Sequence, residues 1–135
     1  MRRSASRRSG SDRGSASLEI AILGPALLLL IFAIVQGALW FYARSLALAA
    51  AQEGAAAGRA RGAPASVGVH RANAFLQRSA QDSLQGTTVS SAGSSATTIR
   101  IEVKGRSLSV LPGFPGIDVS QSAEAPVERF TTGTG

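Results

Sequence analysis

The chain contains no cysteine and little of the chemistry that most functional sites require. Without cysteine, disulfides and thiolate metal sites are excluded. The single histidine, His70, has no second imidazole to help it bind a metal, so a surface or helix-face residue is the better interpretation. We find no paired nucleophile and base, no glycine-rich phosphate loop and no basic surface interleaved with aromatics. We therefore expect a protein that is not an enzyme and has no cofactor, no metal and no nucleic-acid partner.

Charge is also missing from one long stretch of the chain. No charged residue occurs between Glu19 and Arg44, and the run from Ile20 to Tyr42 has Gln36 as its one clearly polar residue. As a helix this run would be about 34 Å long, enough for a bilayer core of about 30 Å. We interpret it as a single transmembrane helix, with the lipid bilayer as a partner.

Positive charge gathers just before that run. Five arginines precede Ser15, against one acid, Asp12, and this segment takes much of the net charge of +6. Arginines that flank a first transmembrane helix keep their side of the membrane cytoplasmic. The expected location is therefore the cell membrane, with the N-terminus cytoplasmic and the C-terminal part extracytoplasmic. The arginines are Arg2, Arg3, Arg7, Arg8 and Arg13.

The expected organisation has three parts: residues 1–14 as a basic leader peptide, residues 15–60 as a transmembrane and extended N-terminal helix, and residues 61–135 as a small extracytoplasmic α+β domain. The long helix should run from Leu18 to about Gly58, with a kink favoured at Gly24-Pro25. A second, amphipathic helix should run from Pro64 to about Leu84 and end at Gly86. Its apolar stripe consists of Val69, Ala72, Leu76, Ala80 and Leu84.

The remainder predicts a small antiparallel sheet of about three strands. Apolar and polar residues alternate over Ile99–Lys104 and again over Ile117–Val127, where Pro126 suggests an edge strand. A weaker strand, Thr87–Ser91, could form a hairpin with the first through Ala92–Ala96. Pro112–Gly116 predicts a turn-rich connection, and Thr131–Gly135 a frayed end. The fold class is thus α+β, and a core this small should depend on lipid and neighbouring subunits.

Taken together, Gly14, Glu19, Pro25 and Gln52-Glu53-Gly54-Ala55 resemble the TadE-like family of pilus assembly proteins, pseudopilins of the tight-adherence (Flp, type IVb-like) system. The resemblance covers roughly Gly14 to Arg59 and implies a pilin-like fold. It implies cleavage after Gly14 by a prepilin peptidase, which would make Ser15 the new N-terminus. The implied partners are that peptidase, other pilins and pseudopilins, and a membrane assembly platform.

Glu19 also has a physical argument of its own. A charge within hydrocarbon costs about 2.5–3.5 kcal/mol at a helix centre, so it usually has a partner. The resemblance implies that the partner is the α-amine of Ser15 on a neighbouring subunit. A simpler interpretation is that Glu19 lies in the first turns of a helix, where the macrodipole favours negative charge.

Three residues are candidates for helix packing. Ala33 and Gly37 have the spacing that lets a second membrane helix approach closely, a spacing that also arises by chance in apolar segments, and Pro25 would shape the helix before them. Trp40 and Tyr42 stand at the end of the run, where amphipathic rings favour the membrane interface; simple packing explains them as well.

The expected function is that of a membrane-inserted minor pseudopilin, associated with a pilus and processed after Gly14. The alternative is a single-pass, membrane-tethered binding module in which Gly14 is not processed. A third hypothesis, a secreted enzyme released by signal peptidase, would use the small residues of Ala47–Ala51 as its cleavage site. It is disfavoured because the apolar region is far longer than the roughly 7–15 residues of a signal peptide.

Overall fold

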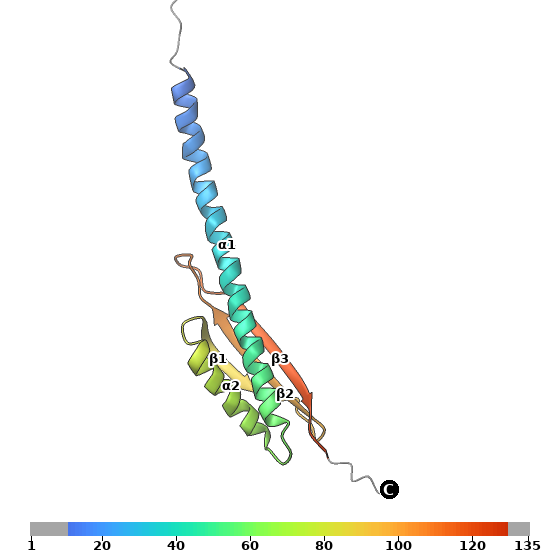
Figure 1. Cartoon of the computed structure of the whole chain (residues 1–135). Coiled ribbons are helices and arrows are strands. Elements are labelled where there is room, and N and C mark those ends of the chain that lie inside the picture. Colours follow the sequence, from blue (N-terminus) through green and yellow to red (C-terminus); the bar gives the residue numbers. More distant parts are fainter. Residues whose placement is uncertain (1–10, 130–135) are drawn as a thin grey trace, which may run out of the picture. The chain divides into compact units, whose positions relative to one another are not determined.

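The computed structural model describes residues 11–129, with side chains from Arg13 onward. Its elements are two helices, α1 (Ser11–Gly58) and α2 (Ala65–Ser79), followed by three strands, β1 (Leu84–Ser90), β2 (Thr98–Ser107) and β3 (Asp118–Pro126) (Figure 1). The predicted α+β class is confirmed. The arginines of the leader before residue 11 and the predicted frayed end, Thr131–Gly135, lie outside the described residues. The chain divides into two compact units, residues 1–34 and 35–135.

The described part of the first unit is helical throughout. The helix begins at Ser11, not at the predicted Leu18, so that Gly14 and Ser15 are already helical. Extending an existing helix costs far less than nucleating a new one, which explains how small residues of weak propensity are included. Helical structure also continues through Pro25, where a missing N–H removes one backbone hydrogen bond.

The second unit contains the sheet, whose strands lie in the order β1-β2-β3 and are all antiparallel. The predicted hairpin is confirmed: β1 and β2 pair through the loop that follows Ser90. Their register shifts between Gln85 and Thr88, where Gly86 adopts a φ of +58°. The strand that carries Pro126 pairs with β2 alone among the described strands, so it is the edge strand that proline predicted.

The core lies between the sheet and the two helices. Ile99, Ile101 and Val103 are buried, whereas their neighbours Arg100, Glu102 and Lys104 are at least partly exposed, as the alternation predicted. α1 contributes mostly alanine to this core. α2 contributes buried residues that recur once per helical turn along one face. The buried apolar residues are Ala43, Leu46, Ala47, Ala50, Ala51, Ala55, Ala72, Leu76, Ala80, Leu84, Ile99, Ile101, Val103 and Val119.

The predicted end of the second helix is wrong. α2 ends at Ser79, and Leu84 is instead the first residue of β1, with Gly86 inside that strand. Ala80 and Leu84 are nevertheless both buried in the core. The apolar spacing therefore continues through a turn because both residues pack on the same core, although the helical backbone does not continue.

Candidate functional site

The three residues of the predicted processing site lie in the first turns of α1. Gly14, Ser15 and Glu19 are all exposed. A Cβ built on Gly14 would meet no atom within 4 Å. Packing within the described chain therefore does not require a glycine at this position, and a requirement for one would have to come from another molecule.

Glu19 lies among exposed apolar side chains. Its neighbours Leu18 and Ile20 are 64% and 71% exposed. Within residues 11–129, the structure records no hydrogen bond and no ion pair to the Glu19 carboxylate. The carboxylate is thus accessible to a cation from outside the described residues.

The rest of the first unit is apolar on every side. Its large side chains are exposed around the helix. Some of them line an apolar hollow of about 480 Å³ on the helix surface. By length and composition, α1 is the one helix among the described residues that could cross a membrane, which fits a single-pass membrane protein. The hollow is lined by Ile20, Leu23, Gly24, Ala26, Leu27 and Leu30.

The predicted helix-packing residues are not engaged within the chain. Pro25 and Ala33 are exposed on the helix of the first unit, and Gly37 is exposed in the second unit. A Cβ on Gly37 would contact nothing within 4 Å. Any packing at these residues must therefore involve lipid or another chain.

Gly54, quoted above for its family resemblance, has a structural role that the sequence did not indicate. A Cβ on Gly54 would lie 2.7 Å from the carbonyl oxygen of Gly68 in α2 and 3.2 Å from Cγ2 of Ile101 in β2. Gly54 therefore lets α1 and α2 touch backbone to backbone over the sheet. A glycine inside an alanine-rich helix was the signal of this close approach.

Glu53, next to Gly54, ties the same two helices together by charge. Its Oε1 accepts a hydrogen bond from Nε of Arg71 at 2.8 Å and lies 3.7 Å from Nη2 of Arg78. Both arginines belong to α2. The segment Gln52–Ala55 of α1 thus contains these contacts to α2.

Gln36 is the second functional residue whose role sequence reasoning missed. Its side-chain Nε2 donates to the carbonyl of Leu108 at 2.9 Å, and its Oε1 accepts from the N–H of Val110 at 3.1 Å. Gln36 as a whole is 9% exposed. A lone polar residue in an apolar run was the available signal.

The aromatic residues at the end of the run differ from each other. Trp40 packs against the core, and the centroid of its ring lies 5.6 Å from the guanidinium carbon of Arg44. Tyr42 remains exposed. Of the two predicted interface residues, Trp40 has a packing role within the second unit.

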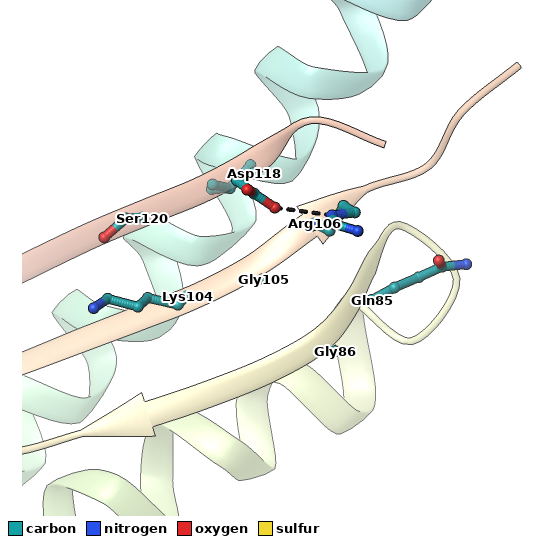
Figure 2. Close-up of a pocket in the computed structure, with 8 residues that line it drawn as sticks. Gln85, Gly86, Lys104, Gly105, Arg106, Asp118 and Ser120 are labelled. Carbon is teal, nitrogen blue, oxygen red and sulfur yellow. Dashed lines mark hydrogen bonds and ion pairs between the residues drawn. The ribbon is translucent and has the colours of Figure 1, made fainter. Parts of the chain in front are cut away.

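The outer face of the sheet carries a hollow of about 640 Å³ around Gly105 (Figure 2). Most of its polar side chains have partners on the same face of the sheet. Arg106 donates from Nε to Asp118 at 2.8 Å, and both Ser120 and Lys104 lie against Glu102, at 3.2 and 3.6 Å. These contacts are cross-strand and same-strand pairs that stabilise the wet face of a sheet. His70 is exposed on α2, apart from the residues that line this hollow.

Comparisons with known proteins bear on the N-terminal helix. A family model described as TadE-like protein matches residues 14–56. Searches of curated proteins and of solved structures found no significant match. The matched segment starts at Gly14 and includes Glu19, Pro25 and Gln52–Ala55, the residues on which the resemblance was based. Residues 14–56, about a third of the chain, are therefore similar to TadE-like proteins.

Proposed function

We propose that this protein is a membrane-inserted minor pseudopilin of a tight-adherence pilus, cleaved after Gly14 by a prepilin peptidase. The observation that carries the proposal is Glu19: a carboxylate without a partner among the described residues, on an all-round apolar helix, five positions after the glycine at which the family match begins. Such a charge is costly in a membrane unless a cation meets it.

Cleavage would supply that cation. Cutting the Gly14–Ser15 bond creates an α-amine on Ser15, which is positively charged at neutral pH. On a neighbouring subunit this amine would pair with Glu19 and set the two helices in register. Because proteases of this kind need an extended backbone, the first turns of α1 must open before cleavage, and a glycine at position 14 makes that opening easier.

The topology follows from the arginines. With the leader in the cytoplasm, residues beyond the span are extracytoplasmic, and the second unit, residues 35–135, would face the envelope or the pilus. Other pilins, pseudopilins and the assembly platform would be the partners of the exposed apolar helix.

The decisive experiment is mass spectrometry of the protein extracted from membranes of its native host. We expect a chain that starts at Ser15; an intact Met1 under conditions of pilus production would overturn the proposal. Gly14→Leu should block processing, whereas Gly24→Leu, at another exposed helical glycine with open space around it, should not. Glu19→Val should impair pilus assembly while processing and membrane insertion continue.

Two alternatives have distinct outcomes. If Gly14→Leu protein functions normally in the host, the protein is a tethered binding module. Release by signal peptidase would produce a soluble chain that begins near Gln52. That alternative conflicts with the fold, because Ala47, Ala50 and Ala51 are helical and fully buried, at 0% exposure, so the cleavage would remove part of the core.

A further inference from the structure

We propose that the β2–β3 connection, residues 108–117, enters the lipid bilayer at its boundary with water and is a second membrane contact beside the transmembrane helix. This inference rests on the proposed membrane insertion of α1. Figure 1 shows the connection at one end of the sheet and the β1–β2 loop at the other.

The apolar run does not end where the folded unit begins. The second unit starts at Val35, so residues 35–42 of the run Ile20–Tyr42 belong to it. The remaining helix, residues 20–34, is about 22 Å long, whereas the bilayer core is about 30 Å thick. A bilayer core of this thickness therefore extends past Val35 along the helix. It reaches the level of Gln36 and of the residues to which Gln36 is hydrogen-bonded.

Gln36 binds the β2–β3 connection. Its amide spans the backbone from the Leu108 carbonyl to the Val110 N–H. This pair of hydrogen bonds fixes the start of the connection against α1, at the point where the run is still apolar. The two hydrogen bonds also satisfy the amide itself, which removes most of the cost of placing a polar side chain at this depth.

The side chains of the connection suit lipid. The connection, LSVLPGFPGI, contains no charged residue, and Ser107 just before it is uncharged as well. Phe114 is 68% exposed and Ile117 46% exposed, although both are large and apolar. An exposed phenylalanine at a loop tip next to a membrane span is an unusual cost in water and a favourable contact in the bilayer interface.

Several backbone N–H groups of the connection are hydrogen-bonded within the protein. Irregular backbone at membrane depth requires this, because each unpaired polar group there costs several kcal/mol. The N–H of Leu111 donates to Oγ of Ser109 at 3.2 Å, and the N–H of Phe114 donates to the Leu111 carbonyl at 3.2 Å. The N–H of Ile117 donates to Oγ of Ser107 at 3.1 Å. Pro112 and Pro115 have no N–H to satisfy.

The connection ends at an ion pair. Arg106 and Asp118, which flank it in sequence, lie side by side with Nε and Oδ1 2.8 Å apart, and both side chains are exposed (Figure 2). An exposed pair of charges belongs on the water side of the interface. The depth of the connection is thereby bounded, with apolar residues 108–117 inside and the charged pair outside.

The absence of native cysteine allows a direct test by single-cysteine labelling. The full chain would be reconstituted in vesicles of phosphatidylcholine and phosphatidylglycerol, with an environment-sensitive fluorophore at one of three positions. Phe114→Cys reports on the connection, Leu27→Cys on the transmembrane helix, and Ala96→Cys on the β1–β2 loop. Ala96 is exposed and lies beyond the opposite end of β2, a strand about 33 Å long, so it is the matched control.

We expect the labels at positions 114 and 27 to shift to shorter emission wavelengths and to lose intensity when the vesicles contain brominated lipids, while the label at position 96 does neither. If position 114 behaves like position 96 while position 27 is quenched, this inference is wrong and membrane insertion stands. If position 27 is not quenched, the proposed insertion itself fails.

A blue shift at position 114 without quenching by brominated lipid would mean that another protein chain covers the connection, which also overturns the inference. Ile117→Cys provides a second reporter if the label at position 114 disturbs folding. Circular dichroism of each labelled variant checks that the helices and the sheet are retained.

Discussion

Gly54 of α1 and Gly68 of α2 contact each other reciprocally. A Cβ on Gly54 would lie 2.7 Å from the carbonyl oxygen of Gly68, and a Cβ on Gly68 would lie 2.7 Å from the carbonyl oxygen of Gly54. Neither carbonyl belongs to a flexible side chain that could move away. The two helices therefore approach as closely as backbones allow, and only because both residues are glycine.

The first prediction concerns this contact. We expect Gly54→Ala to destabilise the second unit by about 1–3 kcal/mol, the usual cost of overpacking a tight core, despite the better helix propensity of alanine. Denaturation monitored by circular dichroism in detergent micelles measures the change. Gly37→Ala is the matched control: it is helical, exposed and uncrowded, so it should be neutral or stabilising by up to about 1 kcal/mol. Equal stability of the two variants would contradict the proposed contact.

The second prediction tests the hydrogen bonds of Gln36. Gln36→Leu keeps the approximate volume but leaves the Leu108 carbonyl and the Val110 N–H unpaired. We expect a loss of about 1–3 kcal/mol and faster hydrogen exchange at Val110, measured by NMR. Gln52→Leu, at an exposed position of the same helix, should leave exchange at Val110 unchanged. Unchanged exchange in both variants would show that the amide does not hold the connection.

The third prediction concerns Glu53 and Arg71. A double-mutant cycle with Glu53→Gln and Arg71→Gln should give a coupling of about 0.2–1 kcal/mol, the range for solvent-accessible ion pairs. The coupling should fall as salt is added, because ions screen exposed charges. A second cycle with Arg44→Gln, about 13 Å from Glu53 along the helix axis, should give none. A salt-independent coupling would indicate packing and not charge.

The fourth prediction concerns the closure of the β2–β3 connection. A Cβ on Gly116 would overlap the carbonyl oxygen of Ser107, so Gly116→Ala should open the junction where the Ser107 N–H donates to the Ile117 carbonyl at 2.9 Å. Gly113→Ala is the comparison, since Gly113 has a φ of +77° and open space around it, and it should cost about 1 kcal/mol through backbone strain alone. Thermal unfolding should rank Gly116→Ala as the more destabilising. The reverse order would contradict the predicted overlap.

The strands and the core face could be predicted from the sequence because alternation directly reports a sheet with one buried face. The end of α2 could not. A spacing of three and four residues continues from Leu76 to Ala80 and Leu84, and it is satisfied by burial whether or not the backbone stays helical. The periodicity therefore predicts which residues face the core, but it cannot predict the turn after Ser79.

The point along α1 at which the apolar residues begin to face the protein core could not be predicted for a related reason. Lipid and a protein core both accept apolar side chains, so nothing in the run distinguishes residues that face a membrane from Ala43 and Leu46, which face the sheet. The roles of Gln36 and Gly54 depend on partners more than ten residues away in sequence, Leu108 and Gly68, which a local pattern cannot identify. The position of Gly14, by contrast, follows from a local motif.

The alanine-rich face of α1 has a thermodynamic consequence. Alanine has no rotamers to lose, so placing Ala43, Ala47, Ala50, Ala51 and Ala55 against the sheet costs no side-chain entropy. Each methyl group also buries little area, and the heat-capacity change of unfolding follows the apolar area exposed. The second unit should therefore unfold with a heat-capacity change below the usual value of about 12–15 cal/mol/K per residue, and its stability should vary unusually little with temperature.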